Sequence, residues 1–242
     1  MSADISRRTL LSRTAAVTGG TALASLAGST LSAPSAQAAT PPSAADSPAP
    51  DEVTTGQPSL NGWEMEKAAD GGGSIWTRPV LGTPLDGVQV RMGDAETVLV
   101  HVIQRFHYEI DSLRRGDVVG WRHPGKVRKG LAESNLASGT AVHIRPGFYP
   151  SGQRGGYFPN QLVIVRDILA DLEGVVRWGG DDKKPDEALF YIDVKPGNGH
   201  LLKVADKLRG WASTPGEGAG ASTDPFEPAR RRAAERLARL QA

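Results

Sequence analysis

The residues that can form a hydrophobic core are confined to one stretch of about 150 residues, the size of a single domain. The first residue of this stretch is Trp63, and the last with helical spacing are Leu208 and Trp211. The chain has no cysteine, so the domain must fold without disulfides. We therefore expect one domain over residues 61–212, with further segments on both sides.

Three segments of this domain carry apolar residues at the spacing of a helix. In the first, over residues 97–114, they recur every three or four positions, at Leu99, Ile103, Phe106, Ile110 and Leu113. Similar spacing over residues 162–172 and 201–211 predicts two more helices, which end near Gly174 and Gly210. His101 falls on the face opposite the apolar residues of the first helix.

Residues 140–144 and 188–194 are short, rich in β-branched or aromatic residues and bounded by Gly or Pro, which predicts strands. The helices and strands do not alternate regularly, so a doubly wound parallel sheet is disfavoured. We expect an α+β domain with a small, mostly antiparallel sheet packed by helices.

The N-terminal segment has the three parts of a twin-arginine export signal. Arg7 and Arg8 precede a leucine pair, residues 14–31 are weakly hydrophobic, and Ala36-Gln37-Ala38 offers a cleavage site. The hydrophobic run is too short and polar to span a bilayer stably, and we expect no transmembrane segment. The sequence therefore predicts a signal peptide at residues 1–38, a Pro/Ala/Ser-rich linker at 39–60, and a secreted or extracytoplasmic protein.

Residues 213–242 form the second appended segment, a Gly-rich linker followed by a basic helix from residue 228 onward. Its single acid is Glu235, and its basic residues are Arg230, Arg231, Arg232, Arg236 and Arg239. Such a helix could contact anionic wall polymers or lipid, or it could be a solvated, frayed terminus.

Composition excludes several classes of function. The net charge is +1, and removal of residues 1–38 takes away three arginines and one aspartate, leaving −1. This balance gives no electrostatic basis for nucleic-acid binding by the whole chain. The absence of cysteine removes thiolate nucleophiles, and no G-x-S-x-G sequence is present.

Separate segments of the domain resemble the metal-binding motifs of the zinc D-alanyl-D-alanine carboxypeptidase family. Residues 134–143, Ser-Asn-Leu-Ala-Ser-Gly-Thr-Ala-Val-His, are similar to the family's first motif, Ser-x-His-x-x-Gly-x-Ala-x-Asp. Trp-Gly-Gly at residues 178–180 and Asp-Glu-Ala-Leu-Phe at residues 186–190 resemble its second motif, Trp-Gly-Gly followed by Asp-x-x-His-Phe. Asn61-Gly62-Trp63 matches the start typical of the actinobacterial branch. The resemblance covers residues 61–212 and implies the fold shared by DD-peptidases and Hedgehog domains.

In that family one zinc is held by the His and Asp of the first motif and the His of the second, and an acid three residues before the last His is the general base. The resemblance places Leu136, His143 and Leu189 at the three ligand positions and Asp186 at the base position. Leucine has no lone pair to donate, and one histidine does not hold a catalytic zinc. We therefore expect that no zinc or other cofactor is bound and that the two leucines fill the site.

Two further site positions have open interpretations. Asp186 could accept hydrogen bonds from a bound peptide, or it could cap a turn after Pro185. Arg122 or Arg128 lies where family members carry an arginine that holds substrate or transition-state charge, and we take Arg122 as the candidate.

Three functions remain open. The first is a secreted pseudopeptidase that has lost the zinc site and binds peptidoglycan stem peptide or another extracellular partner. The second is an active cell-wall metallopeptidase with a relocated metal site, although no two histidines have the i, i+4 spacing of a metal-binding helix. The third is an interaction module whose basic C-terminal helix is the working part.

Overall fold

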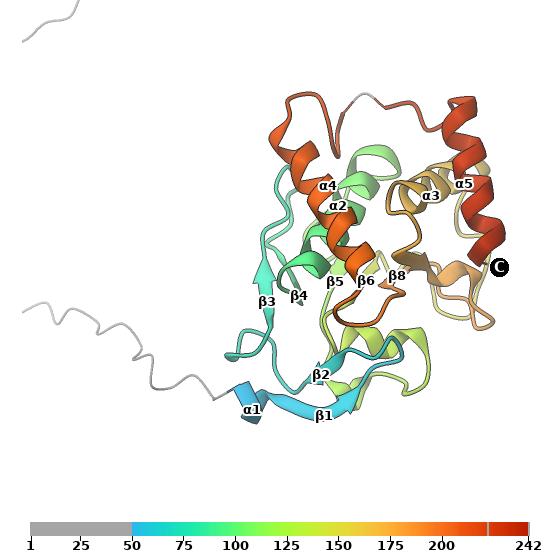
Figure 1. Ribbon diagram of the computed structural model, residues 1–242. Helices are drawn as coiled ribbons and strands as arrows, with labels where there is room; N and C mark the ends of the chain where they lie inside the picture. The colour runs from blue at the N-terminus through green and yellow to red at the C-terminus, as the bar shows by residue number, and fades with distance from the viewer. Residues whose placement is uncertain (1–49, 222, 242) are drawn as a thin grey trace, which may run out of the picture. The chain divides into compact units, whose positions relative to one another are not determined.

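The computed structural model describes residues 50–221 and 223–241 (Figure 1). The largest sheet within them has four antiparallel strands. Their order is β5 (Val118–Val119), β6 (Ala141–Ile144), β8 (Leu189–Ile192) and β7 (Val176–Trp178). The strands expected over residues 140–144 and 188–194 are thus confirmed as β6 and β8. They are neighbours in the sheet, with His143 opposite Leu189 and Val142 opposite Phe190.

The remaining strands form two small antiparallel hairpin-like pairs. One pair is β1 (Thr54–Pro58) with β2 (Glu64–Glu66), and the other is β3 (Ile75–Arg78) with β4 (Val88–Arg91). Short helical turns are α1 (Pro50–Val53), η2 (Pro124–Lys126), η3 (Ala132–Leu136) and η4 (Gly179–Asp181). None of these short elements was predicted from the sequence.

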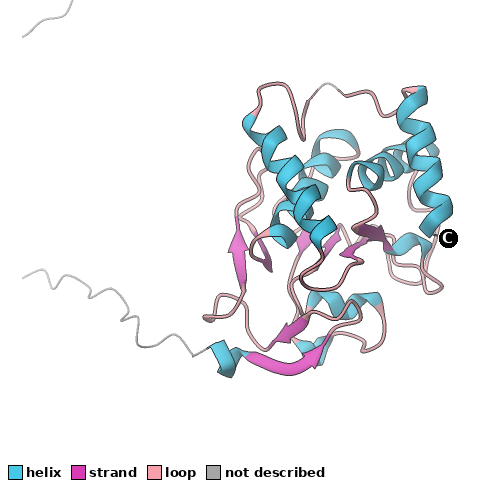
Figure 2. Cartoon of the chain, viewed as in Figure 1, coloured by secondary structure: helices cyan, strands magenta, loops and turns pink. Residues whose placement is uncertain are grey.

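The described residues include four longer helices, and Figure 2 colours helices cyan. They are α2 (Asp94–Glu109), α3 (Pro159–Asp171), α4 (Gly199–Ser213) and α5 (Pro228–Gln241). The expected helices over 162–172, 201–211 and from 228 are confirmed. The first helix begins and ends earlier than the predicted 97–114. It ends before Ile110, and the backbone N–H of Leu113 donates to His107 Nδ1 instead of continuing the helix. The domain is therefore α+β, as expected.

Both faces of the four-stranded sheet are buried, each in its own hydrophobic cluster. Because side chains alternate along a strand, Val142 and Phe190 join the main core under helices α2, α3 and α4. Ala141, Leu189 and Tyr191 belong to a smaller cluster on the other face, which η3 and β2 cover. Here we call this second group the small cluster; its members are Met65, Val127, Ala132, Leu136, Ala137, Ala141, Leu189 and Tyr191.

The N-terminal boundary of the domain lies earlier than expected. Residues 54–58 form β1, and Val53 is only 2% exposed, so the second half of the predicted linker 39–60 is part of the fold. Ser59 is buried, and its hydroxyl lies 2.8 Å from the hydroxyl of Ser138. The prediction failed because threonine, glycine and proline in this segment resemble linker composition, whereas the contacts that hold it are hydrogen bonds. The predicted signal peptide, residues 1–38, lies outside the described residues.

The C-terminal helix is not a solvated terminus, and that interpretation is corrected. Helix α5 packs beside α3 (Figure 1), and its Ala234 is buried. Arg230 donates to both carboxylate oxygens of Asp167 and to Asp171. Arg177 also donates to the backbone oxygen of Gln241. This packing was not predicted from the sequence, because the apolar residues of α5 are few and one of its arginines, Arg230, is held by carboxylates of α3.

His101 lies opposite the apolar face of α2, as expected, but it is not at the surface. Its side chain is only 6% exposed, and its ring lies 6.1 Å from that of Trp211 on α4. Burial, and then the positive charges of Arg105 and Lys207, lower the pKa of His101 to about 3. The imidazole is therefore neutral at physiological pH.

Within the described residues, no helix is both long enough and apolar enough to cross a membrane.

Candidate functional site

The structure brings together the four positions that the sequence analysis singled out in its two motifs. His143 on β6 and Leu189 on β8 are register partners in the sheet. Leu136 ends η3, which packs on the same face, and Asp186 lies in the turn that leads into β8. All four are at most 5% exposed. The positions therefore meet at one place on the sheet, although they are up to 53 residues apart in sequence.

Leu136 and Leu189 are both in the small cluster, with 0% and 1% of their surface exposed. They occupy the space with apolar packing, which leaves no donor atom from either position. Gly139 between the motif positions has a φ of +67°, and a Cβ there would lie 2.7 Å from the backbone nitrogen of Arg91. This motif glycine is thus required by the close approach of another segment.

His143 and Asp186 form a buried polar pair at the edge of this cluster. His143 Nε2 lies 3.2 Å from Asp186 Oδ2, while His143 Nδ1 is buried without a hydrogen-bond partner. The backbone oxygen of Asp186 accepts from Leu189 N–H, and its own N–H donates to Gly179. Asp186 therefore closes a turn, as one interpretation expected, and also directs its side chain to His143.

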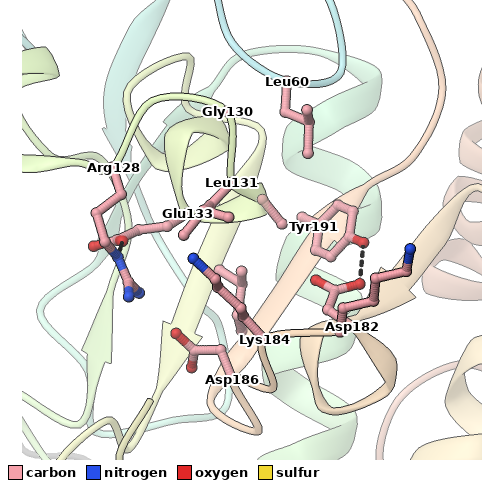
Figure 3. A pocket seen from close by; sticks show the side chains of 12 residues that line it. Leu60, Arg128, Gly130, Leu131, Glu133, Asp182, Lys184, Asp186 and Tyr191 are labelled. Carbon is pink, nitrogen blue, oxygen red and sulfur yellow. Dashed lines mark hydrogen bonds and ion pairs between the residues drawn. The ribbon is translucent and has the colours of Figure 1, made fainter. Parts of the chain in front are cut away.

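A cavity of about 350 Å³ is lined in part by Asp186, the carboxylate of this pair (Figure 3). It extends from Leu60 across the segment 128–133 to the loop 182–186, and Leu189 and Tyr191 contribute from β8. Its lining contains both charges and apolar side chains: Leu60, Arg128, Leu131, Ala132, Glu133, Asp182, Lys183, Lys184, Asp186, Leu189 and Tyr191.

The two candidate arginines differ in their place. Arg128 lines the cavity, where its Nε donates to Glu133 and its Nη2 donates to the hydroxyl of Ser151. Arg122 does not line it; its nearest ion-pair atom lies 3.9 Å from the same Glu133. Arg128 is therefore better placed than Arg122, our sequence candidate, to meet a ligand in this cavity.

Two lysines at the opposite side of the cavity are free to meet a ligand. Lys183 and Lys184 are exposed, and neither has a hydrogen bond or ion pair with any other described residue. Asp182, which precedes them, accepts from the hydroxyl of Tyr191 at 2.9 Å. Burial raises the pKa of Tyr191, and the neighbouring Asp182 raises it further, so this phenol remains a donor.

Several residues of this cavity were not predicted from the sequence. Tyr191 could have been found, because it lies two positions after Leu189 and strand side chains two apart share a face. Leu60 was assigned to the linker. It is held here because its N–H donates to Ser134, while Asn61 donates to Thr140 and to the backbone of Ile192. Glu133 and Lys184 carried no motif that marked them.

The donor set does not fit a zinc ion. Of the three positions, only His143 has a ligating atom, and leucine cannot coordinate a metal. Among residues 50–221 and 223–241, no group of three or more His, Asp or Glu side chains is arranged to hold a metal ion.

Comparison of the chain with protein-family models, curated proteins and solved structures found no match.

Proposed function

We propose that this chain is an exported, catalytically silent relative of the zinc D-alanyl-D-alanine carboxypeptidases, with the Hedgehog/DD-peptidase fold. Its cavity binds short peptides that end in a free carboxylate, such as the stem peptides of peptidoglycan. The observation that carries the proposal is the convergence of Leu136, His143 and Leu189 beside Asp186. Residues that motif similarity assigns to one metal site should meet in space if the assignment is right.

The charges of the cavity support a carboxylate ligand. Lys183 and Lys184 are cations without a partner among the described residues, and Arg128 has only part of its donors engaged. Such groups hold a peptide carboxylate by charge-assisted hydrogen bonds. The apolar part of the lining, from Leu60, Leu131 and Leu189, suits the methyl groups of alanine.

Binding is tested by calorimetric titration of the chain with the tripeptide L-Lys-D-Ala-D-Ala and with its C-terminal amide. We expect the acid to bind and the amide to bind at least about tenfold more weakly, because one charge-assisted contact is lost. The variant Lys184→Glu should weaken acid binding by a similar factor. Lys203→Glu, at an exposed lysine on α4, is the matched control. Equal affinity for acid and amide would exclude a carboxylate-directed cavity.

Loss of the metal site is tested by restoring it. The triple variant L136H/H143D/L189H returns the three family ligands and should hold about one zinc per chain in elemental analysis, since three protein ligands make a catalytic zinc site. The wild-type chain, purified without a histidine tag, should hold none. The single variant L136H, which supplies only two imidazoles, is the control.

The second candidate, an active metallopeptidase with a relocated site, has one observation in its favour. His143 and Asp186 could supply two ligands. Stoichiometric zinc in the wild-type chain, together with release of D-alanine that a chelator abolishes, would support this candidate and refute the first.

Export by the twin-arginine route is part of the proposal and rests on the sequence of residues 1–38. Replacing Arg7 and Arg8 together by lysine should leave the chain inside the cell, because the arginine pair is what the export system reads. The wild-type chain should be found outside the membrane.

A further inference from the structure

Helix α5 is fixed on the domain in one orientation, and this determines which of its side chains face outward. Arg230 is held by Asp167 and Asp171 on α3, and Ala234 is buried. Leu237 packs against the main core. These three residues mark the inner face of α5, so the residues on the other side of the helix point away from the domain.

Three arginines share that outer face. Arg232, Arg236 and Arg239 are spaced by four and three residues, which places them on one side of the helix. All three are exposed, and none has an ion pair with a described carboxylate. The nearby Glu235 is 4.0 Å from Arg231, an exposed contact of little strength. The outer face of α5 therefore carries excess positive charge.

An apolar groove runs between α3 and α5, next to this face. Its volume is about 280 Å³, and most of its lining is apolar: Pro159, Leu162, Val163, Pro225, Ala234 and Ala238, with Arg166, Arg231 and Glu235 at its polar margin. The two helices lie side by side in Figure 1.

Two exposed phenylalanines are the sequence neighbours of residues that line the groove. Phe158 directly precedes Pro159 and is 69% exposed, and Phe226 directly follows Pro225 and is 47% exposed. Large aromatic side chains exposed beside an apolar groove mark an interaction surface. We call the groove, these two phenylalanines and the three outer arginines the α3–α5 surface.

We propose that the α3–α5 surface docks on the surface of an anionic lipid bilayer. Basic side chains are attracted to anionic headgroups, and phenylalanine inserts at the boundary between headgroups and acyl chains. The apolar groove can receive part of an acyl chain. This combination of charges and apolar surface is what an interfacial contact requires.

Other partners fit this surface less well. A soluble anionic polymer would satisfy the arginines but would leave the groove and both phenylalanines in water. A second copy of the chain would bring its own three arginines toward these, which is repulsive.

The test is co-sedimentation of the chain with vesicles of phosphatidylglycerol and of phosphatidylcholine. The full chain and the chain from residue 39 onward are compared, so that binding by the N-terminal segment is separated from binding by the α3–α5 surface. We expect both chains to bind anionic vesicles at least about tenfold more strongly than neutral ones, since each basic residue near the surface adds attraction. Binding by the full chain alone, or equal binding to both lipids, would overturn the proposal.

Two variants locate the contact. R232E/R236E/R239E and F158S/F226S should each reduce binding to anionic vesicles by at least about tenfold. The matched charge control is K126E/K195E/K203E, at exposed lysines outside this surface, and the matched aromatic control is F148S, at a phenylalanine that is 64% exposed. If the arginine variant loses binding, F158S/F226S retains it and soluble polyphosphate displaces the wild-type chain, the partner is a polyanion and the membrane proposal is wrong.

Discussion

Leu136 occupies a position where a polar side chain would find few partners. It is fully buried in the small cluster among apolar neighbours. We predict that Leu136→His alone destabilises the domain by about 2–4 kcal/mol, because apolar packing is lost and an imidazole is buried without a full set of hydrogen bonds. The free energy of unfolding in urea measures this.

The control for this change is Leu136→Met, which keeps the volume and should cost less than about 1.5 kcal/mol. A histidine variant as stable as the wild-type chain would show that the cluster accommodates a polar group, and the idea of a site filled by apolar packing would fail.

His101 gives the domain an acid-sensitive contribution to stability. Its pKa is about 3 in the folded chain, whereas an unfolded histidine has a pKa near ~6.5. Between these two pKa values only the unfolded state binds the proton. The contribution of neutral His101 to the free energy of unfolding is therefore complete above pH ~6.5 and falls as the pH is lowered toward 3. Replacing His101 by leucine should therefore reduce the loss of stability between pH 7 and pH 5 by about 2 kcal/mol.

Urea unfolding at both pH values, with the exposed His200→Leu as control, measures this difference. A His101→Leu variant with the same pH dependence as the wild-type chain would mean that the imidazole is protonated without cost.

At the residue scale, the sequence predicted which residues meet at the candidate site better than it predicted how deeply a single side chain is buried. Motif spacing identified Leu136, His143, Asp186 and Leu189, which the structure brings to one place. The sequence did not predict that His101 is buried, because the ring packed near it belongs to Trp211, more than a hundred residues away in sequence.

Among the elements, α5 makes the contact that its composition least suggests. Asp167 is 1% exposed and accepts hydrogen bonds from both Arg105 and Arg230. We predict that Arg230→Ala destabilises the chain by about 1–3 kcal/mol, because it removes one of two cations that balance the carboxylates of α3. Chemical denaturation measures it.

Arg232→Ala is the matched control, two residues along the same helix but on its outer face. It should change stability by less than about 0.5 kcal/mol. Equal effects of the two substitutions would show that α5 is not held by the Arg230 ion pairs.

Helices α2, α3 and α4 were predictable because each carries several apolar residues at regular spacing, as α2 does at Leu99, Ile103 and Phe106. The short strands were not. β5 has two residues and β2 has three, too few for alternation to show, and their pairing depends on distant partners.

For the whole molecule, the domain begins before Asn61. Val53 is buried, β1 pairs with β2, and Ser59 is hydrogen-bonded to Ser138. We predict that a chain starting at residue 61 is less stable by at least about 2 kcal/mol than one starting at residue 50, because this burial and these hydrogen bonds are lost. Thermal and urea unfolding of the two chains test this boundary. Equal stability of the two chains would mean that the domain begins at residue 61, as the sequence predicted.

The small cluster also restricts how the sequence can change over time. Leu136 and Leu189 lie in one cluster, so a single substitution of either by a metal ligand places a polar group among the partners of the other. By the stability prediction above, each first step toward a metal site would lower stability and gain no catalytic metal, because a catalytic zinc needs three protein ligands. Selection for folding alone removes such intermediates. If the proposed function is right, the pair of leucines makes the return of a metal site depend on several substitutions at once, whatever the cavity binds.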